Sequence, residues 1–270
     1  MNIAITGAGG RLGSEFVKRG CEPLDCDITS REQVREAIAA VEPVMIINCA
    51  AFTAVDAVED KEGYEQAIAV NTRGPGILRT EFDGTIVHIS TGYIFDGKGG
   101  PYDEEATPSP INQYGWTKLG GEAAVSVRQP TIIIRTLDLF GAGEKTDFVR
   151  QIQDVLELGA KYALPTNLYG SPTYIPHLVE GVLAAARMGE RGVLNIAGDL
   201  VVSRYTWGTM IAEAFGHDPE IIEPTDEIKG KAPRPLRGGL LVDKAKSLGI
   251  PIFSPEEGLR DLVERSDDQT

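Results

Sequence analysis

The sequence predicts an α/β fold, a doubly wound parallel sheet with a smaller C-terminal lobe. Two observations predict it: short apolar runs of strand length alternate with longer helical patterns, and beyond Gly141 the pattern becomes less regular and richer in proline. In sheets of this kind a ligand binds beyond the carboxyl ends of the strands. We therefore expect the ends of the first, third, fourth and fifth strands to line one crevice, with the lobe closing over it.

Strands are expected where runs are short, rich in β-branched residues and bounded by Gly, Pro, Asp or Asn. These runs are residues 2–6, 23–26, 44–48, 85–90, 131–135 and 193–196. Helices are expected where apolar residues recur with helical spacing, and Ser30 is the expected N-cap of the second helix. These stretches are residues 11–19, 31–41, 64–79, 112–127, 147–158, 175–188 and 204–215. The pattern assigns residues 1–140, with 171–197 returning to them, to the sheet domain, and residues 141–170 and 198–270 to the lobe.

The 270-residue chain carries a formal net charge of −14, which argues against a nucleic-acid backbone as a partner. Its three cysteines, Cys21, Cys26 and Cys49, fit neither a disulfide scaffold nor paired metal-ligand spacing, and the histidines are scattered, so no metal is expected. No membrane-spanning segment or signal peptide is expected, because the chain begins directly with a strand pattern. These features predict a cytoplasmic protein.

A glycine-rich turn, with Gly7, Gly10 and Gly13, follows the first strand and opens the first helix. Such glycines let the backbone turn sharply and approach a pyrophosphate, which rests on the helix N-terminus. The spacing differs from the more familiar G-x-G-x-x-G, and the alternative is an ordinary loop. Its place at the first strand–helix junction nevertheless indicates dinucleotide binding of the Rossmann type. Arg11 and Leu12, inside the turn, belong to the predicted cofactor contacts.

Residues after the second and third strands are candidates to contact the adenosine half of a dinucleotide, where an acidic residue is expected. Asp27 is a candidate acceptor for the adenine amino group and Asp25 for the ribose, although Asp25 is as well suited to capping the following helix. At the end of the third strand, the small side chains of Ala50 and Ala51 permit close contact with a cofactor.

A tyrosine and a lysine, Tyr114 and Lys118, lie one helical turn apart and face the same way. A nearby ammonium stabilises a phenolate, which predicts that the pKa of Tyr114 lies below its usual value of about 10 and that this phenol can transfer a proton. Thr91, at the end of the fourth strand, is placed to hydrogen-bond a substrate oxygen beside the tyrosine. Such a pair arises often by chance, so only the combination and order of these features is specific.

These motifs together resemble the extended short-chain dehydrogenase/reductase family, and within it the dTDP-4-dehydrorhamnose reductases. The segments that carry the resemblance are residues 7–13, 48–56, 70–71, 90–97, 114–122, 135–136, 170–174 and 234–235. The resemblance implies that reduced NADP or NAD gives hydride to the 4-keto group of a nucleotide-linked deoxysugar. It also implies that Tyr114 protonates the forming alkoxide, that Lys118 holds the nicotinamide ribose, and that Thr91 orients the carbonyl.

The resemblance extends the set of predicted contacts. For the cofactor they are Asp27, Ile28, Ala50, Ala51, Thr53, Asn71 and Ile89, together with Tyr114 and Lys118. For the nucleotide-sugar substrate they are Thr91, Gly92, Tyr93, Asp138 and Arg234. The helices expected at residues 64–79 and 112–127 are the candidate interface of a homodimer.

The sequence also departs from the pattern of the reductases that it resembles. Gly92 stands where an Asp usually follows the catalytic Thr, Asp138 stands where a sugar-facing Trp is usual, and Asn167-Leu168 stands where Asp-Gln is usual. Exchange of an aromatic platform for a carboxylate should change which sugar is accepted. The segment after the second strand is short, which leaves the choice between NAD and NADP open. Arg11 is either a contact for a 2′-phosphate or an exposed helix arginine.

Two other functions remain open at this stage. Epimerases of the same superfamily keep the cofactor bound and use it transiently, whereas dehydratases are disfavoured because Gly92 and Tyr93 stand where those enzymes place an acidic pair. A non-catalytic NADP-binding regulatory subunit, similar to the beta subunit of methionine adenosyltransferase, is the other alternative. Retention of Thr91, Tyr114 and Lys118 together favours catalysis.

Overall fold

A computed structural model describes residues 2–141 and 147–267 of the chain. Its centre is a six-stranded sheet of order β10-β5-β4-β3-β1-β2, in which all neighbouring strands run parallel. The strands are β1 (Ile3–Thr6), β2 (Glu22–Pro23), β3 (Met45–Asn48), β4 (Thr85–Thr91), β5 (Thr131–Thr136) and β10 (Gly192–Asn195). The predicted parallel sheet is confirmed. Residues 1, 142–146 and 268–270, which fall within the predicted domain ranges, lie outside the described residues.

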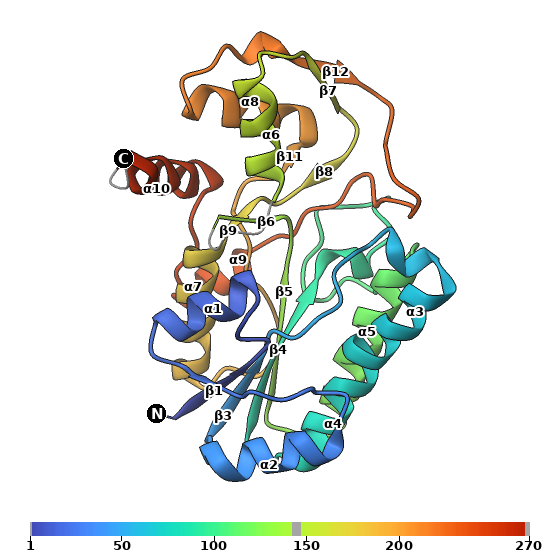
Figure 1. Cartoon of the computed structure of the whole chain (residues 1–270), viewed down its shortest axis with the longest axis vertical. Helices are drawn as coiled ribbons and strands as arrows, with labels where there is room; N and C mark the ends of the chain where they lie inside the picture. The colour runs from blue at the N-terminus through green and yellow to red at the C-terminus, as the bar shows by residue number, and fades with distance from the viewer. Residues whose placement is uncertain (1, 142–146, 268–270) are drawn as a thin grey trace.

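Helices cover both faces of this sheet (Figure 1). They are α1 (Arg11–Lys18), α2 (Arg31–Val41), α3 (Lys61–Ala67), α4 (Gly74–Glu81), α5 (Gln113–Ser126) and α7 (Ile175–Met188). On one face α1 packs beside α7, and on the other α2, α4 and α5 pack side by side. The sheet is therefore doubly wound, as the alternation of strand and helix predicts.

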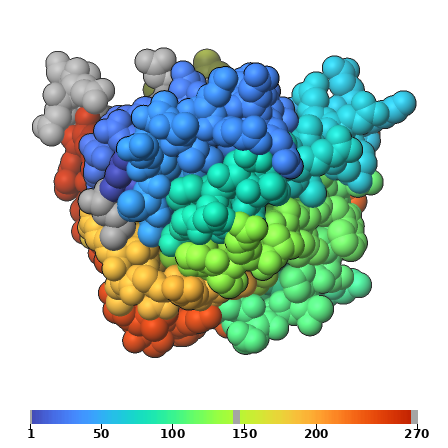
Figure 2. Space-filling view, turned by 90° about the horizontal axis from the view of Figure 1, so that it is seen from below, coloured from blue at the N-terminus to red at the C-terminus, as the bar shows by residue number. Residues whose placement is uncertain are grey.

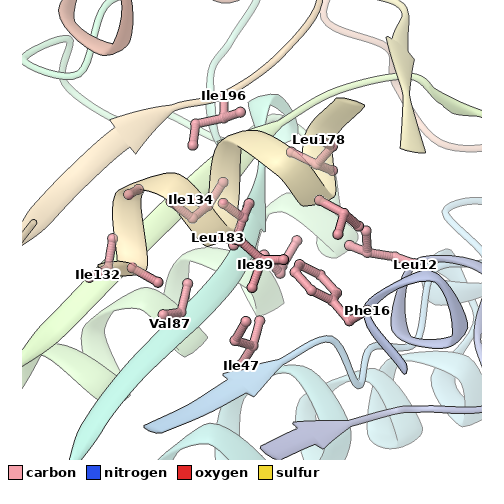
Figure 3. Close-up of a cluster of buried hydrophobic side chains, with 14 of the residues drawn as sticks. Leu12, Phe16, Ile47, Val87, Ile89, Ile132, Ile134, Leu178, Leu183 and Ile196 are labelled. Atoms are coloured by element: carbon pink, nitrogen blue, oxygen red, sulfur yellow. The ribbon is translucent and has the colours of Figure 1, made fainter. Parts of the chain in front are cut away.

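Two cores, one on each face, are supplied by the same strands. Figure 3 shows Ile47 and Ile89 gathered with Phe16 of α1 and Leu178 of α7 in the first core. Side chains alternate along each strand, so Ile46, next to Ile47, belongs to the second core on the opposite face. This is why the strands are continuous apolar runs instead of alternating ones.

The helix predicted over residues 64–79 is interrupted in the structure. Between α3 and α4 lies a π-helical segment, η2 (Ile68–Arg73), in which backbone hydrogen bonds span five residues instead of the four of an α-helix. The side chain of Asn71 in this segment bonds both backbone groups of Phe52, and Gly74 packs so closely on Ile28 that a Cβ would lie 2.6 Å from its Cδ1. The wider turn thus serves a tertiary contact that helical periodicity alone does not reveal.

The lobe is built from segments that follow β5. Its elements include α6 (Phe148–Glu157), β7 (Tyr162–Pro165), β8 (Tyr169–Gly170), β11 (Val202–Ser203), α8 (Arg204–Ala214) and β12 (Ile222–Thr225). The other short elements beyond β5 are β6 (Leu139–Phe140), β9 (Thr173–Tyr174), α9 (Asp243–Ser247) and α10 (Pro255–Asp267). Short 3-10 turns complete the chain at η1 (Ala57–Glu59), η3 (Gly92–Ile94) and η4 (Pro219–Ile221). Helices α6 and α8 confirm their predictions and share a core around Trp207. Ala245 of α9 and Ile250 belong to a core of the sheet, although the sequence-based division groups them with the lobe.

The end of the molecule opposite the lobe is closed by segments from distant parts of the chain. Figure 2 looks onto this end, where blue, teal, green and yellow-orange segments meet in one continuous surface. Within residues 2–141 and 147–267, no helix is long and apolar enough to cross a membrane. The same described residues contain no group of three or more His, Cys, Asp or Glu side chains suited to hold a metal ion.

Candidate functional site

A cavity of about 360 Å³ lies at the carboxyl ends of the strands, on the side of the lobe. This volume falls in the range of small-molecule sites, roughly 300–1,000 Å³. Segments that follow β1, β3, β4 and β5 all contribute, so the predicted crevice is confirmed. Its lining residues are Gly10, Arg11, Leu12, Gly13, Cys49, Ala51, Thr53, Val55, Ile89, Ser90, Thr91, Tyr93, Tyr114, Lys118, Thr136, Leu137, Asp138, Leu139 and Ile175.

The glycine turn forms one end of this cavity. Gly7 adopts a left-handed φ of 67°, and the Gly10 amide donates to the Gly7 carbonyl over 2.9 Å. A Cβ on Gly13 would lie 2.1 Å from the Gly7 carbonyl oxygen, so the helix and turn can meet only without a side chain there. Gly10 caps α1 without a side-chain hydrogen bond, which leaves the first amides of the helix for an anion. This cradle fits the pyrophosphate of a dinucleotide.

Tyr114 lies in the first turn of α5, beneath the cavity. Asn112 caps this helix by accepting a hydrogen bond from the Gly115 amide over 2.8 Å. The cap fixes the start of the helix and hence the direction in which the Tyr114 side chain meets the cavity. The Tyr114 ring meets Tyr93 edge-to-face, with centroids 5.7 Å apart. Its phenol shares a side-chain hydrogen bond with Thr91 at the end of β4. The predicted meeting of Thr91 and Tyr114 is thus present in the structure.

The pKa of Tyr114 is raised from its ordinary value, and the expectation of a lowered pKa is wrong for this structure. Burial is the largest cause and the neighbouring Tyr93 adds to it, while the bond with Thr91 opposes the rise. The Lys118 ammonium, which was expected to lower it, instead donates to the Ile89 carbonyl over 2.6 Å. The phenol is therefore neutral at physiological pH, which is the form that donates a proton.

Lys118 is buried at the floor of the cavity, one turn after Tyr114. Burial lowers its pKa from 10.5 to about 8, and the Glu122 carboxylate and Cys49 oppose that change. The lysine is thus poised to lose its charge a little above neutral pH. Cys49 itself is a poor nucleophile here, because burial raises the pKa of its thiol.

A buried ion pair below Lys118 is a feature that the sequence reasoning missed. Arg135 of β5 binds both oxygens of Glu122, over 3.2 and 2.9 Å, and Ser90 donates to the same carboxylate over 2.5 Å. All three side chains are buried. The signal was present in the sequence, because a charged residue ends the apolar strand run at Arg135 and a second one follows Lys118 by one helical turn.

Several predicted cofactor residues lie behind the cavity lining. Asn71 is fully buried and holds the loop that follows β3 through its two bonds to Phe52 and one to Thr117. The Ile28 side chain is buried in the core. Gly7 and Ala50 form the base of the turn, where a Cβ on Gly7 would lie 2.8 Å from the Ala50 nitrogen.

The acidic segment after β2 is exposed and self-contained. Asp27 accepts from both the amide and the hydroxyl of Thr29, over 2.9 and 2.8 Å, and so closes a turn. The helix cap is Ser30, as predicted, and not Asp25. Asp27 lies outside the cavity lining, four residues after the end of β2.

On the lobe side, three Arg–Asp pairs surround the cavity. Arg11 of α1 binds Asp147, the N-cap of α6, over 2.8 Å. Its guanidinium is therefore paired with a carboxylate and is not the free, exposed helix arginine of the second interpretation. Arg234 binds Asp56 over 2.7 Å. Arg204 of α8 binds Asp138, a pairing that the sequence reasoning also missed.

The predicted substrate residues are divided between the cavity and its surroundings. Thr91, Tyr93 and Asp138 line the cavity, whereas Gly92 is buried beside it, where a Cβ would lie 3.3 Å from a Leu137 methyl. Arg234 lies outside the lining and is held by Asp56.

The chain is similar in sequence to a known family over nearly its whole length. The family described as RmlD substrate binding domain matches residues 1–267. A dTDP-4-dehydrorhamnose reductase of Mycolicibacterium smegmatis is 35% identical, covering 97% of this chain and 84% of the relative. A dTDP-4-keto-6-deoxy-D-glucose reductase of Streptomyces niveus is 34% identical, covering 91% of this chain and 90% of the relative.

Solved structures are similar in fold as well. The dTDP-4-dehydrorhamnose reductase of Bacillus anthracis, solved in complex with NADP, superposes with a TM-score of 0.91 at 27% identity and covers 98% of this chain and 100% of that one. The ortholog from Clostridium acetobutylicum gives a TM-score of 0.89 at 30% identity, covering 99% of this chain and 100% of that one.

Proposed function

The chain belongs to the family described as RmlD substrate binding domain, and from that membership we propose that it is an NAD(P)H-dependent reductase of the 4-keto group of a nucleotide-linked deoxysugar. One observation carries the proposal: Thr91 of β4 and Tyr114 and Lys118 of α5 meet at a cavity that begins at a glycine turn. The relatives that support the reaction type are themselves named as reductases of dTDP-linked keto sugars.

The residues present fit a dinucleotide. We assign the pyrophosphate to the turn of Gly7, Gly10 and Gly13 with Arg11 and Leu12, because the open amides of α1 face the cavity there. The remaining cofactor contacts that we propose are Asp27, Ile28, Ala50, Ala51, Thr53, Asn71, Ile89, Tyr114 and Lys118. When bound, the reduced nicotinamide supplies the hydride for the carbonyl carbon.

Tyr114 supplies the proton for the carbonyl oxygen in this proposal. Its neutral phenol, held by Thr91, is placed to hydrogen-bond the ketone and then to protonate the oxygen as negative charge develops on it. Thr91 orients the same oxygen through its hydroxyl. The Lys118 ammonium, fixed on the Ile89 carbonyl, retains further N–H donors for a ribose hydroxyl and places a positive charge near the reacting centre.

We propose a division of labour between the two parts of the chain. Residues 1–140 with 171–197 hold the cofactor, and residues 141–170 with 198–270 contribute the walls that select the sugar. Support comes from the cavity itself, whose lining is drawn chiefly from the strand ends, and from the lobe segments that border it at Arg204 and Arg234.

The test uses dTDP-4-keto-6-deoxy sugars with NADPH or NADH, followed by the loss of reduced-nicotinamide absorbance. Tyr114→Phe should lower turnover by at least about 100-fold, the usual contribution of general acid catalysis, while cofactor affinity stays nearly unchanged. Tyr162→Phe, which changes a phenol of the lobe strand β7, is the matched control and should retain activity.

Unchanged turnover in Tyr114→Phe would remove this phenol from the mechanism. Absence of turnover by the wild-type chain with both cofactors, together with co-purification of a stoichiometric partner, would instead favour a regulatory subunit.

A further inference from the structure

Arg204 brings a cation from the lobe to the edge of the cavity. It is the first residue of α8, whose N-cap is Ser203, and its backbone amide donates to the Leu168 carbonyl over 2.8 Å. The guanidinium carbon lies 4.7 Å from the centre of the Phe148 ring, so the group rests on an aromatic face while it binds Asp138. These contacts fix the guanidinium in one place.

Asp138 is held in an unusual conformation to meet this cation. Its φ is 51°, in the left-handed region that residues other than glycine rarely adopt. Its Oδ2 lies where a side chain of residue 170 would begin, since a Cβ on Gly170 would be 1.8 Å away. Strained backbone at the edge of a cavity is a common mark of a functional position, because the surrounding structure must maintain it.

The pair lies on the same wall as the reacting phenol. Asp138 and Tyr93 line the main cavity and also a small side pocket, to which Arg204 contributes. Tyr93 packs edge-to-face on Tyr114. The wall therefore runs from the phenol through Tyr93 to the Asp138–Arg204 pair, so a sugar whose keto oxygen meets the phenol would lie against this pair.

The chemistry of the pair suits an oxygen acceptor. A guanidinium has five N–H donors in a planar fork. Among the described residues, its one hydrogen-bonding acceptor is the Asp138 carboxylate, so donors remain for a ligand. A ring hydroxyl can accept such a bond, whereas a deoxygenated ring position cannot, and a site built to bond a hydroxyl strongly rejects an analogue without it.

We propose that Asp138 and Arg204 form a specificity-determining pair, in which Arg204 donates a hydrogen bond to a ring hydroxyl of the nucleotide-linked sugar and Asp138 positions the guanidinium. The proposal rests on the proposed function for the identity of the ligand, but its deciding test measures binding, and turnover serves only as a second readout for Asp138.

The probes are dTDP-glucose and its 2-deoxy and 3-deoxy analogues, titrated calorimetrically into the full chain. The wild-type chain should bind at least one deoxy analogue about 10- to 100-fold more weakly than dTDP-glucose, the effect of one hydrogen bond to a charged group. The measured quantity is the ratio of the dissociation constant of the deoxy analogue to that of dTDP-glucose. Arg204→Met should reduce that ratio to near 1. Arg204→Lys should leave a reduced ratio, because an ammonium lacks the planar fork. Asp138→Asn should lower the ratio several-fold and, with a reducible sugar, raise KM while kcat stays nearly constant.

Matched controls remove equivalent charges from ion pairs outside the cavity lining. Asp199→Asn takes a carboxylate from Lys246, and Arg35→Met takes a guanidinium from Glu81. Both should keep the wild-type ratio. Thermal melts of every variant report whether it folds.

The proposal is overturned if the wild-type chain binds all three probes equally, or if folded Arg204→Met and Arg204→Lys both retain the full ratio. A further outcome is that the wild-type chain binds the probes with the expected ratio and Arg204→Met loses it, while the wild type reduces no 4-keto sugar. That result would support the Asp138–Arg204 pair and contradict the proposed function. The two failures are thus distinguishable.

Discussion

The two walls of the cavity are held together by different forces. The sheet wall comprises the glycine turn with Thr91, Tyr114 and Lys118. These three side chains are buried, and Lys118 and the turn are fixed by hydrogen bonds to backbone carbonyls. The lobe wall, comprising Asp138, Arg204 and the segment around Arg234, contains one ion pair, Arg204–Asp138, and is joined to the loop after β3 by a second, Arg234–Asp56. In each pair at least one side chain reaches solvent. The wall proposed to carry the chemistry is thus held by buried contacts, and the wall proposed to select the sugar is held by ion pairs that reach solvent.

This difference indicates how such a site can vary its substrate. A change within the sheet wall disturbs a packed core, because each group there has buried partners. A change within the lobe wall alters one ion pair whose members also contact solvent, which costs little stability. We therefore expect substitutions in the sheet wall to reduce stability and activity together, and substitutions in the lobe wall to change mainly substrate preference.

The largest effect is expected at the buried ion pair of the sheet wall. Glu122→Gln leaves the Arg135 guanidinium without its carboxylate, at a site where both side chains are only 5–6% exposed. Removing one partner of a buried pair costs about 3–5 kcal/mol, which urea unfolding would measure. The matched control is Glu223→Gln, whose carboxylate is 44% exposed and pairs with the exposed Lys161, and this change should cost less than about 1 kcal/mol.

The same substitution should move the pH profile of the reaction. Lys118 has a pKa lowered to about 8, and the Glu122 carboxylate holds that pKa up. If the charged lysine is required, wild-type kcat/KM is high below this pH and falls as pH rises through it. Glu122→Gln removes the charge that favours the ammonium, so the fall should come at lower pH. A profile that coincides with that of the wild type would contradict this coupling.

A smaller effect is expected at the glycine turn. Gly13→Ala places a Cβ 2.1 Å from the Gly7 carbonyl oxygen, a backbone atom that cannot rotate away. Overpacking of this kind costs about 1–3 kcal/mol and should weaken NADP binding strongly, because the turn must shift. Gly9→Ala is the control, since a Cβ there meets nothing within 4 Å. Equal cofactor affinity in the two variants would show that the turn is not the binding cradle.

The two walls also differ in how far sequence predicts them. The glycine turn, Thr91 and the Tyr114–Lys118 pair follow from local patterns, because strand ends and helical spacing determine where such side chains point. Arg204 and Asp138 lie 66 positions apart, and Arg234 and Asp56 lie 178 apart. No local rule couples such residues, so the sequence offered Asp138 and Arg234 as separate candidates and did not indicate Arg204 at all.

The pKa of Tyr114 was mispredicted for a related reason. The spacing of Tyr114 and Lys118 correctly places them on one face of α5. It does not reveal that the phenol is buried or that the ammonium is drawn to the Ile89 carbonyl, and these two facts determine the direction of the shift. Burial depends on tertiary packing, which periodicity indicates only for apolar residues.

The smallest change in stability is expected at Asp56, where the lobe wall meets the loop after β3. Its carboxylate accepts from Arg234 over 2.7 Å and from the Lys231 and Ala232 amides over 2.8 and 2.9 Å, so it ties the lobe segment to the loop after β3. The side chain is 47% exposed, and solvent screening limits the loss in Asp56→Asn to less than about 1 kcal/mol.

The pH dependence of this loss has a defined sign. The hydrogen bond from Arg234 is the largest cause of the lowered pKa of Asp56, so the carboxylate stabilises the folded state above its unfolded pKa of about 4. That contribution disappears as pH falls through the lower, folded value. Wild type and Asp56→Asn should therefore differ in melting temperature at neutral pH and converge in acid, while KM for the sugar rises in the variant and kcat changes little. A fall in kcat larger than the rise in KM would show that this wall shapes the reacting centre as well, and the contrast between the two walls would then not hold.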